Sequence, residues 1–440
     1  MTATETLPGF HLLAKPVGPV CNLACKYCFY LEKEALYAHQ PGVSAWALPE
    51  AVLEEYVRRY IESQPTPVIN FAWQGGEPTL LGVEYFRKAV DLQKKYANGK
   101  RIENSLQTNG ILLDDAWCEF LVQNRFLIGL SVDGPREFHD CYRVDKAGGP
   151  SFDKVLRAAE CLNKHKVDFN TLTSVHRRNS LKPLDVYRFL KEAGSGFMQF
   201  IPIVERIAAD PASNRLLVSP HSSAAAHVAE WSVEPLQYGK FLCAIFDEWV
   251  RNDVGTTFVQ LFDVTLSSWV GMEPNLCVFQ RTCGAAAVLE HNGDVYSCDH
   301  YVYPENKLGN IMELPVESML QSPQQVRFGQ DKLDRLPRAC LECPVRFACN
   351  GECPKHRFVR APDGDENLNY LCPGYKLFFA HVKPYMDFMA AELGAERPPS
   401  NIMEWVRERD RRDAEQKKPG RNDACPCGSG LKFKRCCGRG

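Results

Sequence analysis

Several features that would place a chain in a membrane, on nucleic acid or outside the cell are missing from this sequence. The 440 residues include 52 Lys and Arg against 54 Asp and Glu, so the formal net charge of -2 gives no strong attraction to nucleic acid or to an anionic lipid surface. No apolar run approaches the ~20 residues of a membrane-spanning helix. Residues 1–10 show no basic start followed by an apolar segment. We therefore expect a cytoplasmic protein that neither crosses a membrane nor binds nucleic acid.

Cysteine, by contrast, is abundant, with 19 in the chain. Disulfides are rare in a reducing cytoplasm, so grouped cysteines there more often hold metal. Fifteen of the cysteines fall into four tight groups, and each group indicates a metal centre. The remaining four are scattered, and we expect them to be small structural residues: Cys118, Cys141, Cys161 and Cys243.

The first half of the chain alternates between strand-like and helix-like patterns. Strands are predicted over 11–17, 68–73, 102–106, 127–132, 169–175 and 197–203. Helices are predicted over 49–63, 83–96, 114–124, 151–165, 183–193 and 236–251. This alternation is typical of parallel βα units and predicts an α/β fold, a partial (β/α)6 barrel. In such a barrel the chemistry lies at the carboxyl ends of the strands.

Changes in composition divide the rest of the chain. The Ala-, Ser- and Pro-rich stretch 206–234 is expected to be a loop or insertion, whereas dense cysteine and a turn at 292–294 predict a second, cluster-bearing domain. A helix over 376–393 would close that domain. We predict a barrel over 8–235 and a cysteine-rich domain over 236–395. A charged linker with helical content follows over 396–418, and a small separate module occupies 419–440.

Cys21, Cys25 and Cys28 follow the first predicted strand with the spacing C-x3-C-x2-C. Three thiolates on one loop can hold three irons of a [4Fe–4S] cube and leave the fourth iron open to a small molecule. A zinc site would need a fourth ligand, and no other Cys or His lies close by in the sequence. Their position on a strand-to-helix loop of a barrel favours the cluster.

This motif, followed by Phe29-Tyr30, resembles that of the radical S-adenosylmethionine (SAM) superfamily. The resemblance implies that the open iron binds SAM, whose reductive cleavage gives methionine and a 5′-deoxyadenosyl radical that abstracts a hydrogen atom. Gln74-Gly75-Gly76-Glu77 ends the second strand and matches the family's site for the SAM amino group. Polar runs at 105–110 and 131–134 end the next two strands, which favours a lined pocket.

Eight further cysteines lie between 277 and 372, enough for two fully ligated four-iron clusters. On spacing alone, the Cys-x2-Cys pair at 340–343 would also suit zinc. The arrangement resembles the SPASM domain and, within it, the anaerobic sulfatase-maturating enzymes, over about residues 8–385. Specific strings at 71–79, 104–110 and 296–302 carry this likeness.

The resemblance implies roles for individual residues. The first auxiliary cluster would be held by Cys277, Cys283, Cys298 and Cys353, and the second by Cys340, Cys343, Cys349 and Cys372, giving three [4Fe–4S] clusters in all. SAM would lie against Tyr27, Gly76, Glu77, Ser131, Arg143 and Val204.

The implied reaction oxidises a Cys or Ser side chain of a sulfatase polypeptide to formylglycine, with an electron donor such as ferredoxin or flavodoxin. Asp299, next to Cys298, matches the family's proton acceptor, and an adjacent cluster can take the electron. Asp263 is a second acidic candidate, for substrate binding.

The last residues contain Cys425, Cys427, Cys436 and Cys437, with the spacing C-x-C-x8-C-C. Four soft ligands suit a structural Zn²⁺, because so small a module has almost no core of its own. The module resembles the SEC-C motif, which sulfatase maturases do not need. We hypothesise that it docks the enzyme to a nascent substrate, a chaperone or the export machinery. The basic residues 432, 434 and 435 suit either an acidic partner or solvent.

Three functions are compatible with these patterns. The leading one is a peptidyl-Cys or peptidyl-Ser oxidase of sulfatases. A second is another SPASM enzyme that forms thioethers or rings in peptides. A third is a zinc-binding adaptor without catalysis, which iron analysis separates, since three clusters carry about twelve irons per chain.

Overall fold

The computed structural model describes residues 9–37, 42–209, 217–220, 222, 224–416, 421–437 and 439. Six parallel strands predicted from the sequence are present within this part: β1 (His11–Ala14), β2 (Val68–Trp73), β3 (Arg101–Thr108), β4 (Phe126–Ser131), β5 (Phe169–Val175) and β6 (Phe197–Pro202). β2 and β5 have the predicted bounds, and the ends of the others differ by three residues at most. The predicted α/β class and the parallel barrel are confirmed.

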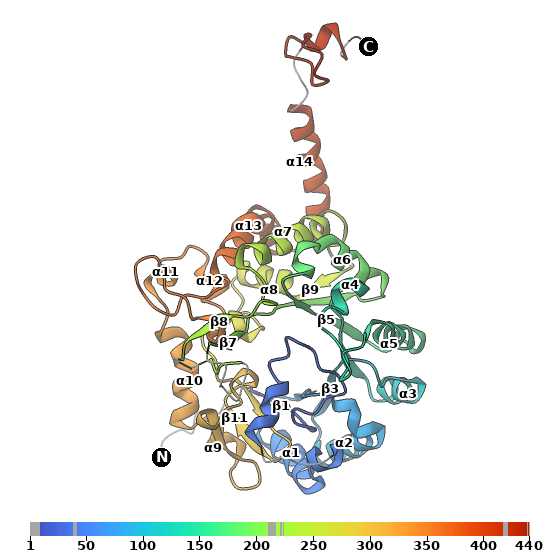
Figure 1. Ribbon diagram of the computed structural model, residues 1–440, viewed down its shortest axis with the longest axis vertical. Coiled ribbons are helices and arrows are strands. Elements are labelled where there is room, and N and C mark those ends of the chain that lie inside the picture. Colours follow the sequence, from blue (N-terminus) through green and yellow to red (C-terminus); the bar gives the residue numbers. More distant parts are fainter. Residues whose placement is uncertain are drawn as a thin grey trace.

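The helices that follow the strands line the outside of the curved sheet (Figure 1). They are α1 (Glu50–Ser63), α2 (Gly82–Tyr96), α3 (Asp115–Gln123), α5 (Phe152–His165), α6 (Pro183–Glu192) and α7 (Pro235–Asn252). Local signals set their starts: Asp114 accepts a hydrogen bond from Trp117 N at the beginning of α3, and Pro183 and Pro235 occupy the first turns of α6 and α7.

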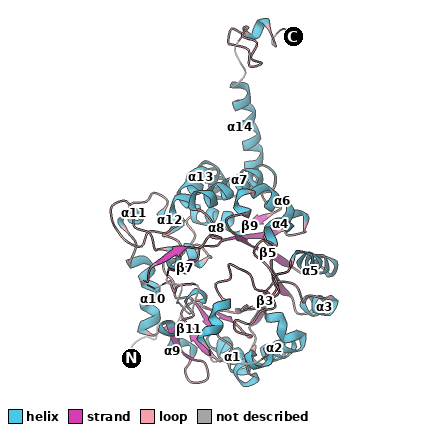
Figure 2. Cartoon of the chain, in the orientation of Figure 1, coloured by secondary structure: helices cyan, strands magenta, loops and turns pink. Residues whose placement is uncertain are grey.

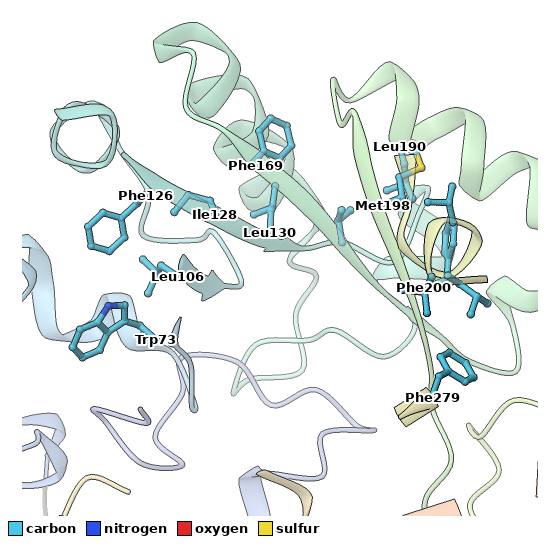
Figure 3. Close-up of a cluster of buried hydrophobic side chains, with 14 of the residues drawn as sticks. Trp73, Leu106, Phe126, Ile128, Leu130, Phe169, Leu190, Met198, Phe200 and Phe279 are labelled. Carbon is cyan, nitrogen blue, oxygen red and sulfur yellow. The ribbon is translucent and has the colours of Figure 1, made fainter. Parts of the chain in front are cut away.

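The strands bury one face and expose the other. Side chains such as Trp73, Leu106, Leu130 and Phe169 point toward the helices and form the core between the two layers (Figure 3). Because side chains alternate along a strand, the intervening residues face the inside of the barrel. That inner face stays accessible, with half of Phe197 exposed. The barrel therefore offers an open interior rather than a second apolar core.

The cysteine-rich segment adds strands to both edges of the barrel sheet. β9 (Phe258–Val259) pairs with β6, whereas β10 (Ala286–Leu289) pairs in parallel with β1. β11 (Asp294–Tyr296) and β12 (Lys307–Asn310) continue antiparallel from β10. Ten described strands thus form one sheet, in the order β12-β11-β10-β1-β2-β3-β4-β5-β6-β9.

The predicted turn at 292–294 is present, with Gly293 at φ +86°, a conformation that favours glycine. The barrel sheet continues across the predicted boundary at 235/236, because β9 to β12 lie after that boundary and belong to the same sheet. The segment boundaries given above stay predictions.

The remaining helices pack around this frame. They are α4 (Arg136–His139), α8 (Gln260–Trp269), α9 (Val316–Leu320), α10 (Pro323–Asp334), α11 (Arg338–Leu341), α12 (Arg346–Cys349), α13 (Cys372–Gly394) and α14 (Ile402–Gln416). In the predicted insertion, part of which lies outside the described residues, β7 (Arg206–Ala208) pairs with β8 (Ala226–Val228).

α14 occupies most of the predicted charged linker. Its first turns bury Ile402 and Val406 against the body, and Arg251 of α7 pairs with Asp410 at 3.0 Å. Beyond them the helix projects away from the body (Figure 2). Among the described helices, none has both the length and the apolar stretch that a membrane crossing requires.

Candidate active site at the open barrel

The loop that follows β1 carries Cys21, Cys25 and Cys28 and crosses the centre of the barrel (Figure 1). The Gly-Gly-Glu run at the end of β2 fixes its start: Gly76 N donates to Gly18 O at 2.8 Å and Glu77 N donates to Val20 O at 2.9 Å. A Cβ atom on Gly76 would lie 2.0 Å from Val20 O, so only glycine fits there. The glycine therefore lets β2 hold the backbone that leads into the first cysteine.

Glu77 is fully buried and its carboxylate is engaged on both oxygens. It accepts hydrogen bonds from the amide and hydroxyl of Thr79, from Thr108 Oγ1 at 2.7 Å and from Asn109 N at 2.8 Å. Burial raises the pKa of Glu77, and these hydrogen bonds oppose the rise. The carboxylate therefore ties the ends of β2 and β3 together, and its contact with SAM stays a prediction.

The thiols of the first group are desolvated. Burial is the largest cause that raises the pKa of Cys21 and of Cys25 to about 12, and each is raised further by the charge of Cys28. Leu23 N donates to Cys21 Sγ at 3.3 Å, and Asn109 Nδ2 approaches the same sulfur at 3.7 Å. Desolvated thiols that receive N–H donors suit metal-bound thiolates, because a bound metal deprotonates a coordinating thiol.

Donor spacing separates clusters from single-ion sites. Among the described residues, two groups of three or more Cys, His, Asp or Glu side chains bring their donor atoms within 4.8 Å of one another. One group is the four cysteines of the C-terminal module, and the other is Asp115, Cys161 and His165. Zinc binds sulfur at about 2.3 Å, which puts its ligands only ~3.8 Å apart. No three of the eleven predicted cluster ligands, all among the described residues, lie within 4.8 Å of one another, which fits an iron–sulfur cube better than one zinc ion.

The eight cysteines of the second segment lie in two sets of four. Cys340, Cys343, Cys349 and Cys372 line one cavity. The other four lie close enough to interact electrostatically. Burial and the charge of Glu352 are the largest causes that raise the pKa of Cys353, and the charges of Cys283 and Cys277 raise it further. After burial, the charge of Cys353 is the largest cause that raises the pKa of Cys298. These neighbours are compatible with the interleaved arrangement that the resemblance implies. Ligation by these residues stays a prediction.

Two of the predicted SAM contacts converge on Asp133, which is not among the predicted site residues. The hydroxyl of Tyr27 donates to its Oδ2, and Arg143 Nε donates to the same oxygen at 2.9 Å. Burial alone would raise the pKa of Asp133, but Arg143 brings it below its usual value. Ser131, the last residue of β4, lies two positions before it. The polar end of β4 was the available signal, since Asp133 follows that strand closely.

Val204 follows β6 and is buried, and its neighbour Glu205 forms an ion pair with Lys355. Lys355 lies two residues after Cys353, and its ammonium is 4.9 Å from the centre of the Phe29 ring. This contact joins three parts of the chain: the end of β6, the loop after Cys28 and the cysteine-rich segment.

Asp299 lies at the same junction and forms an ion pair with Lys15, the residue that follows β1. Lys15 is fully buried, and its ammonium lies 3.5 Å from the centre of the Tyr30 ring. Burial would raise the pKa of Asp299, but Lys15 and then His300 lower it below its usual value. The carboxylate is therefore charged. Lys15 is not among the predicted site residues, because it falls inside the predicted strand 11–17, whereas β1 ends at Ala14.

The structure does not bring Asp263 to this place. It lies on α8 beside a cavity of about 180 Å³ that is also lined by Asn170, Phe197 and Phe258. These residues are the first or second of β5, β6 and β9, so the cavity lies at the amino ends of the strands, opposite the catalytic end of a parallel barrel. Burial raises the pKa of Asp263 to about 6. Its expected part in substrate binding finds no support in this position.

The C-terminal module gathers its four cysteines within 4.8 Å of one another. Sulfur–sulfur distances are 3.3 Å for Cys425–Cys427, 3.4 Å for Cys427–Cys436 and 3.9 Å for Cys436–Cys437. Hydrogen bonds lower the pKa of Cys427 to about 6, and the largest contribution comes from the Ser429 side chain. This compact set fits one tetrahedral zinc ion.

Comparison with known families gives three matches: the radical SAM superfamily over residues 16–190, an iron-sulfur cluster-binding domain over 277–344 and the SEC-C motif over 421–439. The chain is 49% identical over 411 residues to a serine-type anaerobic sulfatase-maturating enzyme of Bacteroides thetaiotaomicron, covering 93% of this chain and 98% of the relative. It is 35% identical over 382 residues to a cysteine-type enzyme of Clostridium perfringens, covering 86% and 97%.

Solved structures agree. Native anSMEcpe with bound AdoMet and the Cp18Cys peptide has a TM-score of 0.75 at 34% identity, covering 88% of this chain and 100% of that chain. Native anSMEcpe with bound AdoMet has a TM-score of 0.75 at 34% identity, covering 87% and 99%.

Proposed function

The chain belongs to the anaerobic sulfatase-maturating enzymes of the radical SAM superfamily, and we propose that it oxidises its target with Asp299 as the proton acceptor. The reaction converts a Cys or Ser side chain of a sulfatase polypeptide to formylglycine. The observation that carries this function is the 49% identity over 93% of the chain, which spans the barrel and the cysteine-rich segment together. The protein is a radical SAM oxidoreductase with [4Fe–4S] clusters, not an adaptor without catalysis.

Cys21, Cys25 and Cys28 would hold the cluster that supplies, with bound SAM, the 5′-deoxyadenosyl radical that takes a hydrogen atom from Cβ of the target. Tyr27, Gly76, Glu77, Ser131, Arg143 and Val204 would hold SAM. Asp133 accepts hydrogen bonds from Tyr27 and Arg143, so it fixes both side chains before SAM arrives.

The remaining steps fall to residues beside Asp299. Loss of the Cβ hydrogen atom, one proton and one electron converts a Ser side chain to the aldehyde. The same loss from Cys gives a thioaldehyde, which water converts to the aldehyde with release of hydrogen sulfide. Asp299 takes the proton from the hydroxyl or thiol. Lys15 keeps the carboxylate charged and directed by its ion pair. A cluster held by Cys277, Cys283, Cys298 and Cys353 would supply the electron acceptor.

Three further assignments complete the proposal. Cys340, Cys343, Cys349 and Cys372 would hold a third cluster that passes the electron on to a ferredoxin- or flavodoxin-like donor and acceptor. A cytoplasmic location suits cysteines that are free of disulfides throughout the described residues. The C-terminal module would bind zinc and dock a nascent sulfatase, a chaperone or the export machinery.

The test is an anaerobic assay of the reconstituted enzyme with SAM, a reductant and short sulfatase peptides that carry Ser or Cys at the target position. Mass spectrometry should show 5′-deoxyadenosine and the peptide aldehyde, and a peptide with Ala at the target should give no aldehyde. A thioether or a ring in the product would instead favour another SPASM peptide modifier. SAM that stays intact would overturn the radical mechanism.

A further inference from the structure

We infer that a metal site lies on the outer helical layer, between α3 and α5, and takes a single divalent cation of the zinc type. Two sets of donor atoms lie within 4.8 Å across the described residues: the module's four cysteines, and Asp115 with Cys161 and His165. The second set is remote from the predicted clusters in sequence and belongs to a different layer of the fold. The sulfur of Cys118 lies 3.3 Å from that of Cys161 but outside this set, and a turn of its side chain toward the other three donors would supply a fourth ligand.

Helix geometry brings the four side chains to the same interface. Asp115 and Cys118 are three residues apart on α3, and Cys161 and His165 are four residues apart on α5. Each spacing places both side chains of a pair on the same helix face, one above the other. α3 and α5 lie side by side on the outside of the barrel (Figure 1). α5 therefore contributes two donors to the close set and α3 contributes Asp115, with Cys118 next to them.

The distances within the set approach those of a single-ion site. Cys118 Sγ lies 3.3 Å from Cys161 Sγ, Cys161 Sγ lies 3.7 Å from Asp115 Oδ1, and His165 Nε2 lies 2.6 Å from the same oxygen. The sulfur–sulfur distances in the C-terminal module run from 3.3 to 3.9 Å. Ligands of one zinc ion stand about 3.8 Å apart, so an outward shift of His165 together with a turn of Cys118 toward Asp115 would admit the ion.

The chemistry of the set selects the cation. Two thiolates, an imidazole and a carboxylate are ligands of zinc and of similar borderline-soft ions, whereas magnesium and calcium prefer oxygen alone. The two thiolates and the carboxylate carry three negative charges. A divalent cation and Lys164, whose ammonium lies 2.7 Å from Asp115 Oδ1, balance them.

Burial gives the site an inner and an outer side. Cys118 is fully buried, the His165 side chain is 19% exposed and that of Asp115 is 60% exposed. An ion can thus enter from solvent past Asp115 and end against the buried sulfur. Bound there, it would join the start of α3 to the end of α5 across the outside of β3 and β4.

The decisive measurement is zinc content per chain in the full-length, anaerobically reconstituted enzyme with excess zinc removed. To set aside the C-terminal module, the comparison is made in a Cys427→Ser/Cys436→Ser background. We expect one zinc per chain in that background and none after adding Cys161→Ser and His165→Gln. Zinc-edge X-ray absorption, which does not detect the iron clusters, should show two sulfur and two nitrogen or oxygen ligands.

Matched changes keep the result interpretable. Cys243→Ser/His381→Gln, on the α7 and α13 pair, should leave the zinc content unchanged. If Cys161→Ser/His165→Gln fails to fold, Asp115→Asn should weaken zinc binding at least about tenfold, since even the loss of an outer-shell partner of a metal ligand has an effect of that size. A background protein without zinc would overturn the site. So would a product with two fewer free thiols, because a Cys118–Cys161 disulfide would then explain the close sulfurs.

Discussion

The cysteines of the barrel and those of the C-terminal module differ in both spacing and burial. Cys21 and Cys25 lie in a desolvated loop, with pKa values raised to about 12 chiefly by burial, and together with Cys28 they do not bring their three sulfurs within 4.8 Å of one another. In the module, Cys427 and Cys437 are exposed and the four sulfurs lie within 4.8 Å of one another. The first arrangement suits a cluster that reacts with a bound molecule, and the second a single ion that replaces a core.

Sequence spacing alone does not separate these cases. Cys25-x2-Cys28 would suit zinc as well as iron, whereas three-dimensional spacing distinguishes them. The two arrangements should therefore respond differently when a cysteine is removed.

The largest effect is expected for Cys25→Ala. A loop with two thiolates no longer holds a cube, so iron content should fall by about four of about twelve atoms per chain. Because no site for SAM cleavage remains, 5′-deoxyadenosine should become undetectable by chromatography. Cys141→Ala, at a half-buried cysteine outside the groups, should leave both values unchanged. Continued SAM cleavage by Cys25→Ala would place the open cluster elsewhere.

Asp299→Asn should separate the two halves of the reaction. Its amide cannot accept the proton, so formylglycine formation should fall about 10²- to 10⁴-fold, the usual contribution of a general base. Formation of 5′-deoxyadenosine should continue, because Asp299 does not belong to the SAM-binding group around Asp133. Both products are measured by mass spectrometry in one anaerobic reaction. Asp263→Asn, at the other end of the barrel, serves as the control, and an equal loss in both variants would contradict the assignment.

How far the sequence predicts this site depends on the range of the interactions. The strands and helices of the barrel follow from local periodicity, so β2 and β5 have their predicted bounds. The joining of β10 to β1 links residues more than 270 positions apart, as His11 opposite Ala286 shows, and no local pattern encodes it. The ion pair of Lys15 with Asp299 depends on that pairing.

The partners of buried polar residues are also hard to predict, because they too come from distant parts of the chain. Asp133 follows β4 and was visible as a polar strand end, but its bonds to Tyr27 and Arg143 join separate loops. The interleaving of Cys353 with Cys298 likewise came from the family resemblance and not from spacing. Sequence patterns give the elements, while the partners of buried charges depend on how those elements pack.

A smaller effect is expected for Lys15→Met, which removes the partner of Asp299 but keeps an apolar chain beside Tyr30. Hydrogen bonds to charged groups contribute about 1.5–3 kcal/mol, so the ratio of formylglycine to 5′-deoxyadenosine should fall roughly tenfold or more. Lys15→Arg should restore part of the ratio, since it keeps the positive charge. In the exposed module, Lys432→Met should change nothing. A ratio equal to that of the unaltered enzyme in Lys15→Met would exclude the positioning role.

The smallest effect on catalysis is expected for Cys427→Ser combined with Cys436→Ser. Without two of its four ligands the module should lose its zinc and unfold, because its few residues bury little apolar surface. Turnover of short peptides should stay the same, since the residues proposed for the reaction lie in the barrel and the cysteine-rich segment. Sulfatase maturation in cells should fall if the module docks a nascent chain, whereas the peptide assay is blind to docking. The two assays therefore need to be read together: a loss in both would mean that the module supports the catalytic body itself, and a loss in neither would remove its proposed docking role.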